Sequence, residues 1–216
     1  MLLTPPEADA VEARIGALEA RTGVEVVTAV VGRSDAYPEI PWKAFALGVV
    51  FAGLVVVALD YLQPEWAGAH ATWLNLAPVL VAGAVSALAA LVVPEYGRLY
   101  LDHVRSAREV RQYAQAMFVD RRLFRTRARN GVLVLASLYE RHVEIVADIG
   151  FDRRVDAAAW ASVIDAMMPR LREARPAAAL LVAVERIEVL LVERGFVGNA
   201  GGGELANRPI DGEGAQ

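Results

Sequence analysis

The sequence predicts an α/β domain that is interrupted by a transmembrane α-helical hairpin. Three observations lead to this fold class. Two long apolar segments lie in the first half of the chain, runs of β-branched residues occur on both sides of them, and amphipathic helix patterns flank those runs. The hydrophobic content of 56% is high for a soluble domain of 216 residues, as expected if part of the chain is embedded in lipid.

Residues 1–41 are predicted to form the first part of the domain, with one helix and one strand. Val11, Ile15 and Leu18 recur at helical spacing, and Gly23 is suited to end that helix because glycine adopts positive φ at low cost. The β-branched run 24–32 follows as a strand. Since one helix and one strand do not make a stable domain, they must pair with chain beyond the apolar segments.

Residues 42–93 are predicted to form the transmembrane hairpin. The apolar segments 42–62 and 73–93 are each close to the ~20 residues that a helix needs to cross a ~30 Å hydrocarbon core. The alternative is a pair of buried core helices, but a small domain has no core large enough to surround both. The small residues of the two segments allow close helix approach, either between the two spans or in a homo-oligomer; they are Gly48, Ala52, Gly53, Ala82, Gly83, Ala84, Ser86, Ala87 and Ala90.

The distribution of basic residues predicts the orientation of this hairpin. The connection 60–72 contains no Lys or Arg, whereas residues 98–129 are rich in arginine. Positively charged flanks stay on the cytoplasmic side. We therefore expect a multi-pass protein of the bacterial inner (plasma) membrane, with the lipid bilayer as a partner and both termini in the cytoplasm.

Residues 94–197 are predicted to complete the domain. A helix is expected over 96–124, followed by strands 132–139 and 142–149 joined in a tight hairpin at Glu140 and Arg141. The first of these strands is almost wholly apolar, which is typical of a strand buried on both faces.

Two further helices and a tail are expected after the strands. Asp156 is a good N-cap for a helix whose stripe includes Trp160, and Pro176 is suited to open the last helix. Residues 198–216 are rich in glycine and are predicted to be a flexible tail. A phosphate loop is the alternative for these glycines, but no strand leads into them and no Lys-Ser/Thr pair follows.

The stretch from residue 125 to residue 164 resembles the TPM domain. The resemblance rests on a T-x-x-R-N-G-V-L stretch, an E-R turn, a strand end and an aromatic-bearing helix, at Thr126, Arg129, Asn130, Gly131, Arg141, Asp148, Gly150 and Trp160. Residues 203–207 look like a degraded form of the family's tail. The resemblance implies a small mixed sheet flanked by helices. Arginines at the junction 125–130 are then expected to pair with acids or to face solvent.

Three carboxylates are the residues to which metal chemistry can be assigned. Asp148, Asp152 and Asp156 recur every four residues, and clustered oxygens are the ligands that Ca²⁺ or Mg²⁺ prefers. Some TPM proteins bind divalent cations and hydrolyse phosphate esters, so the resemblance implies a metal-dependent phosphatase as one hypothesis. In the alternative, Asp148 finishes a strand, Asp152 pairs with a neighbouring arginine and Asp156 caps a helix.

Other chemistries are excluded by the residue inventory. The chain has no cysteine, and Ser137 lies in an apolar strand without a G-x-S-x-G context. His142 opens a strand and is expected to pack at its edge. The net charge of −4 argues against nucleic acid as a partner. The favoured hypothesis is a non-enzymatic, membrane-anchored module that assists the assembly, repair or maintenance of a membrane-protein partner.

Overall fold

A computed structural model describes residues 2–62, 71–198 and 203–214. The chain forms two compact units. The first unit combines residues 1–35 with 104–216, and the second comprises residues 36–103. The predicted connection 60–72 lies mostly outside the described residues.

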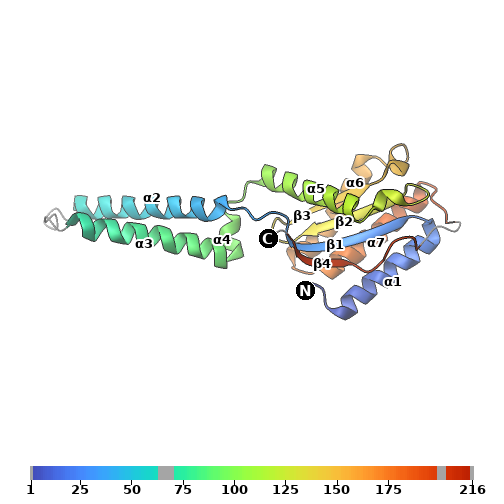
Figure 1. Ribbon diagram of the computed structural model, residues 1–216, viewed down its shortest axis with the longest axis horizontal. Coiled ribbons are helices and arrows are strands. Elements are labelled where there is room, and N and C mark those ends of the chain that lie inside the picture. The colour runs from blue at the N-terminus through green and yellow to red at the C-terminus, as the bar shows by residue number, and fades with distance from the viewer. Residues whose placement is uncertain (1, 63–70, 199–202, 215–216) are drawn as a thin grey trace. The chain divides into compact units, whose positions relative to one another are not determined.

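A four-stranded mixed sheet is the centre of the first unit (Figure 1). Its order is β3 (His142–Ala147), β2 (Gly131–Ser137), β1 (Glu25–Arg33), β4 (Ile210–Gly214). β1 pairs in parallel with β2 and β4, while β2 and β3 are antiparallel. The predicted sharing of one sheet by the two halves of the chain is confirmed.

Helices cover both faces of the sheet (Figure 1). One face packs on α1 (Pro5–Thr22), α6 (Ala157–Arg172) and α7 (Pro176–Glu193). The other face packs on α5 (His103–Asp120) through residues such as Val110. All seven residues of β2 are buried, as predicted for a strand covered on both faces.

Local signals set the ends of several helices as predicted. Gly23 ends α1 with φ 68°, and its N–H donates to the carbonyl of Glu19 at 2.8 Å. The Asp156 carboxylate accepts a hydrogen bond from the N–H of Ala159 at 2.8 Å and caps α6. Pro176 occupies the first turn of α7, where its missing N–H costs no helical hydrogen bond.

The prediction of a single helix over residues 96–124 is wrong. The structure has α4 (Pro94–Arg98), then α5 from His103, then a 3-10 turn over Leu123–Arg125. Gly97 weakens helix propensity at the first break. Arg122 adopts φ 57°, which a continuing helix does not allow, at the second break.

The prediction of a tight hairpin with a turn at Glu140 and Arg141 is also wrong, because the turn between β2 and β3 comprises four residues, 138–141. The Glu140 carboxylate helps to fix this turn. It is buried and accepts hydrogen bonds from Ser137 Oγ and from the N–H of Ser34, the latter at 2.9 Å. These bonds hold the turn against the end of β1.

The flexible tail expected over 198–216 is contradicted for its last described residues, which form β4. Ala29 pairs with Ile210 and Arg33 with Gly214. The Asp211 carboxylate also accepts hydrogen bonds from the N–H groups of Leu2 and Leu3, at 2.8 and 3.0 Å. These partners are about two hundred residues distant in sequence, so glycine content alone gave the wrong expectation.

The second unit contains α2 (Glu39–Leu62) and α3 (Ala71–Val92), which pack against each other. A Cβ at Gly83 would lie 2.6 Å from a methyl of Val49, and one at Gly48 would lie 2.8 Å from Ser86 Cβ. The contact between the two predicted spans therefore uses both glycines. Gly53, by contrast, faces open space.

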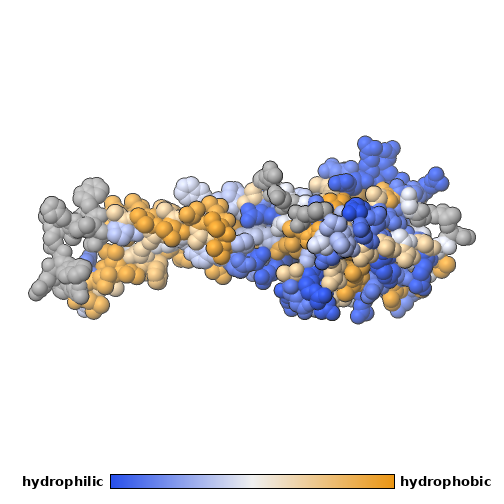
Figure 2. Space-filling view, turned by 90° about the horizontal axis from the view of Figure 1, so that it is seen from below, coloured by the Kyte–Doolittle hydropathy of each residue, from blue (hydrophilic) through white to orange (hydrophobic). Residues whose placement is uncertain are grey.

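Apolar side chains cover the surface of this unit (Figure 2). Phe51 is 70% exposed and Leu54 65% exposed. Within the described residues, one helix, α2, is long and apolar enough to cross a membrane, and Leu76–Val92 of α3 is a shorter apolar helix. The second of the two predicted spans stays a prediction.

Thr28→Val is expected to stabilise the protein by about 1 kcal/mol, because Thr28 Oγ1 is buried in β1 without a hydrogen-bond partner among the described residues. Valine has the same shape and no hydroxyl to desolvate. The buried Thr22 is the matched control, since its hydroxyl donates to the carbonyl of Leu18 at 2.9 Å. Thr22→Val should destabilise the protein in the same urea titration. A loss of stability in Thr28→Val would contradict the assignment.

Candidate functional site

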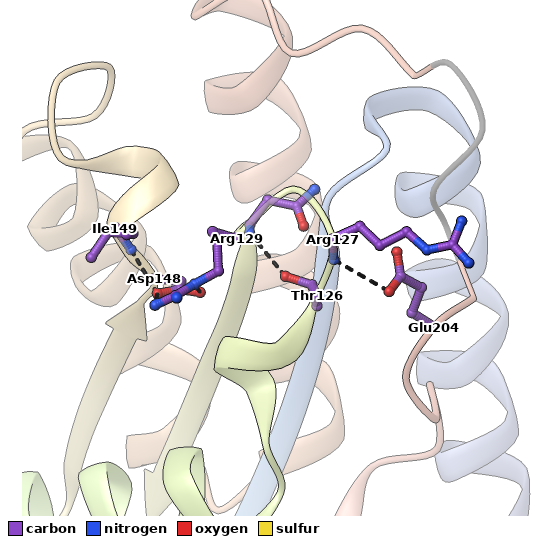
Figure 3. A network of polar contacts seen from close by, with 7 residues as sticks. Thr126, Arg127, Arg129, Asp148, Ile149 and Glu204 are labelled. Carbon is purple, nitrogen blue, oxygen red and sulfur yellow. Dashed lines mark hydrogen bonds and ion pairs between the residues drawn. The ribbon is translucent and has the colours of Figure 1, made fainter.

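The residues of the motif that begins at Thr126 form a turn where β1 and β2 begin (Figure 3). We call residues 126–131 the entry turn. Thr126 Oγ1 accepts a hydrogen bond from the N–H of Asn130 at 3.0 Å, and Asn130 Nδ2 donates to the carbonyl of Gly23 at 2.5 Å. The turn thereby joins the start of β2 to the residue that ends α1.

Arg129 and Asp148 form the ion pair at the centre of this site (Figure 3). Arg129 Nε and Nη2 donate to the two carboxylate oxygens of Asp148 at 2.7 and 3.0 Å. The Asp148 side chain is 4% exposed and that of Arg129 46% exposed. Hydrogen bonding to the carboxylate raises the pKa of the Arg129 guanidinium. Asp148 also accepts from the N–H of Ile149 at 2.8 Å, so its position is fixed on two sides.

Two glycines allow the backbone segments of the site to approach closely. A Cβ at Gly131 would lie 2.4 Å from the carbonyl oxygen of Leu123, and one at Gly150 would lie 2.4 Å from that of Arg129. The N–H of Gly150 donates to the Arg129 carbonyl at 3.0 Å. Glycine is needed at both motif positions because a side chain would overlap backbone atoms.

Two buried carboxylates beneath the entry turn hold the segment that precedes β4. Glu25 accepts hydrogen bonds from the N–H groups of Glu204 and Leu205, both at 3.1 Å. Glu19 accepts from Asn207 Nδ2 at 2.8 Å and from the N–H of Val26 at 3.1 Å. Sequence reasoning did not select either carboxylate; the tail-like residues 203–207 were the one signal that pointed to their partners.

The Glu204 side chain closes the network by accepting from the N–H of Arg127 at 3.4 Å (Figure 3). Residues from both ends of the chain and from its middle thus meet at the entry turn. The buried carboxylates of Glu19 and Glu25 find their donors in the segment that precedes β4, as buried polar groups require. Arg125, just before the turn, and Arg127 within it are exposed.

Burial raises the pKa of Glu19 to about 7, with a smaller contribution from the charge of Glu25. The pKa of Glu19 is higher in the folded state than in the unfolded state, so the folded state binds a proton at Glu19 more tightly. This proton stabilises the folded state at low pH, and the stabilisation is lost as the pH rises towards 7. Wild-type stability should therefore fall across pH 5–8 relative to Glu19→Gln, by up to about 1 kcal/mol per pH unit. Urea titrations at several pH values measure this difference.

The exposed Glu193 provides the control for this prediction. Glu193→Gln should keep the pH dependence of the wild type. Parallel pH profiles for wild type and Glu19→Gln would contradict the raised pKa.

The three predicted metal ligands lie in different settings. Asp148 is held by Arg129, Asp152 is exposed at the end of a 3-10 turn, and the exposed Asp156 caps α6. Arg194 Nη2 lies 3.8 Å from an oxygen of Asp156. Within the described parts of the chain, no three His, Cys, Asp or Glu side chains form a group that could hold a metal ion. A divalent cation bound by these aspartates stays a prediction.

The remaining motif positions lie outside the entry turn. Arg141 is exposed in the β2–β3 turn with φ 51°, at the opposite end of β2. Trp160 packs edge-on against Phe151, with ring centroids 5.7 Å apart, and helps to fix α6 on the sheet. The motif therefore describes the packing of one turn and one helix.

Comparisons with known proteins agree with this architecture. A family model described as the TPM domain matches residues 95–190. The NMR structure of the BA42 protein from the psychrophilic bacterium Bizionia argentinensis has a similar fold, with a TM-score of 0.58 and 15% sequence identity, covering 97% of this chain and 95% of that one. No curated protein matches the chain significantly in sequence.

Proposed function

We propose that this chain, whose residues 95–190 match the family model of the TPM domain, is a membrane-anchored module whose α/β unit binds or stabilises membrane-protein partners in the cytoplasm. The observation that carries the proposal is the second unit, an apolar helical hairpin inserted into the domain. Phe51, Leu54 and Val57 of α2 expose most of their surface, which water disfavours and lipid accommodates.

The connection of this hairpin to the domain supports a single anchoring point. Asp35 is the last residue of the domain before the hairpin, and Arg105 follows its end. Arg105 Nη2 lies 3.3 Å from an oxygen of Asp35. The chain thus leaves and re-enters the α/β unit at one place, as a hairpin anchor requires. The arginine-rich segment after α3 favours a cytoplasmic location for both termini, at the bacterial inner membrane.

Extraction of cell membranes at alkaline pH tests the anchoring. We expect the full chain to stay in the membrane pellet after a carbonate wash and to be released by detergent. Recovery in the carbonate supernatant would contradict an integral anchor.

Partner binding is tested by placing a photo-cross-linking residue at the exposed Arg127, with the exposed Arg186 of α7 as the control position. One membrane protein joined from residue 127 alone would support a specific partner surface, and identical adducts from both positions would contradict it.

The metal-dependent phosphatase is the competing hypothesis, and a phosphate-release assay with Mg²⁺, Mn²⁺ or Ca²⁺ separates the two. The bidentate pairing of Asp148 with Arg129 supports a structural role for that carboxylate. Metal-dependent turnover that disappears in Asp148→Asn with the fold intact would favour the phosphatase. A homo-oligomer formed through the hairpin likewise stays a prediction.

A further inference from the structure

A charged groove lies between α5 and the edge strand β3, away from the entry turn. It is lined by Ala107, Arg108, Arg111, His142 and Glu144, with a volume of about 380 Å³. His142 opens β3, whereas Asp148 of the central ion pair follows the other end of that strand. The groove therefore belongs to a different part of the α/β unit.

Glu144 organises the basic groups of the groove. Its carboxylate accepts a hydrogen bond from Arg111 Nε at 2.9 Å, and His142 Nε2 lies 3.6 Å from its other oxygen. Burial raises the pKa of Glu144, but the interactions with His142 and Arg111 outweigh burial and leave the pKa below its usual value. The side chain is 15% exposed, so a carboxylate fixed in the wall of the groove orients the Arg111 guanidinium.

Hydrogen-bond donors remain available after this pairing. Arg111 uses Nε for Glu144, and its Nη groups have no hydrogen-bond partner among the described residues. Arg108 lies three residues earlier on α5, so both guanidinium groups emerge on one side of the helix. Its guanidinium makes neither a hydrogen bond nor an ion pair with the part of the chain that the structure describes.

We propose that this groove binds a phosphate group. Two guanidinium groups match the oxygens of a phosphate in a way that ammonium groups do not. Arg108 and Arg111 together outweigh the charge of Glu144, so the groove has a net positive charge. Its volume accommodates a phosphate and a small group esterified to it.

Two kinds of ligand carry such a phosphate group: the headgroup of an anionic lipid and a soluble phosphorylated compound. α5 begins shortly after the end of α3, which favours a headgroup if the hairpin is in the membrane. Binding of a lipid headgroup rests on the proposed membrane anchoring, whereas binding of a soluble phosphorylated compound does not.

Binding is tested on the full chain in neutral detergent micelles. The probes are inorganic phosphate and dihexanoyl phosphatidic acid, with dihexanoylglycerol as the lipid that lacks phosphate. Chemical shifts of Arg111 Nε and the His142 ring report on binding. We expect saturable shifts with a phosphate-bearing probe, and a loss of affinity of about tenfold or more in Arg108→Gln. The exposed Arg186 on α7 is the matched control, and Arg186→Gln should bind as the wild type does.

The outcomes separate the two sources and the two proposals. Saturation by inorganic phosphate supports a soluble ligand, and saturation by phosphatidic acid alone supports a lipid headgroup. The inference would be overturned if neither probe gave saturable shifts, or if Arg108→Gln and Arg186→Gln bound the probe with equal affinity. Phosphate binding by a chain that carbonate extracts from membranes would retain the inference and overturn the anchoring.

Discussion

Gly131→Ala is expected to lower the free energy of unfolding by about 3 kcal/mol or more. The added Cβ would lie 2.4 Å from the carbonyl oxygen of Leu123 and 3.2 Å from its carbonyl carbon. Leu123 is fully buried, Gly131 is buried, and the N–H of Asp148 donates to the Gly131 carbonyl at 3.0 Å. Relief of the clash must therefore move backbone that is fixed on two sides, so the cost exceeds that of ordinary overpacking.

Gly16→Ala is the matched control for this substitution. Gly16 lies within α1, and a Cβ there would meet Asn207 Nδ2 at an ordinary distance of 3.5 Å. Alanine should therefore stabilise α1 by up to about 1 kcal/mol through its higher helix propensity. Urea titration of the full chain in detergent, with proteolysis of the unfolded fraction, measures both changes. Equal stability of Gly131→Ala and the wild type would contradict the close packing of the entry turn.

From the proposed anchoring, excision of the hairpin is expected to move the protein from the membrane fraction to the soluble fraction. Replacing residues 36–103 by a short Gly-Ser link removes the exposed apolar residues of α2 and α3, including Phe51 and Leu54. The link can be short because Asp35 and Arg105 are in contact, and closing a short loop costs little entropy. The shortened chain should move almost completely from the carbonate-washed pellet to the soluble fraction, where cell fractionation detects it.

The location and the folded state of the shortened chain separate two ways in which this prediction can fail: the anchor lies elsewhere, or the α/β unit does not fold without the hairpin. A chain that is monomeric by size-exclusion chromatography and has the mixed α/β circular dichroism of the first unit would show that the sheet forms without the hairpin. Retention in the washed membranes would show that the anchor lies elsewhere. Soluble aggregates with lost dichroism would show that the α/β unit depends on the second unit for stability.

Much of the fold was predictable because the signals for it are local. Gly23, Asp156 and Pro176 mark helix ends through their own backbone preferences. The buried run of β2 marked a central strand by its composition. β4 was missed because a glycine-rich segment has weak strand propensity. Its position depends on hydrogen bonds that the N–H groups of Leu2 and Leu3, at the opposite end of the chain, donate to the Asp211 carboxylate.

The candidate site was predictable in part. The resemblance selected Thr126, Asn130 and Gly131, and the structure brings them together in one turn. It did not select Glu19 and Glu25, because isolated glutamates near a helix end are typical of exposed surface. They are buried because the segment before β4 supplies N–H and amide donors, and no pattern near these glutamates indicates that contact.

Labelling of single cysteines in intact cells tests the central claim, that an inserted hairpin anchors one domain whose two halves lie on the same side of a membrane. The chain has no cysteine, so each introduced thiol reports on one position. Asp9→Cys and Val197→Cys should resist an impermeant maleimide until the cells are permeabilised, whereas Ala67→Cys in the connection should be labelled from outside. Labelling of position 9 or 197 in intact cells, with the other protected, would place the halves on opposite sides and contradict the account.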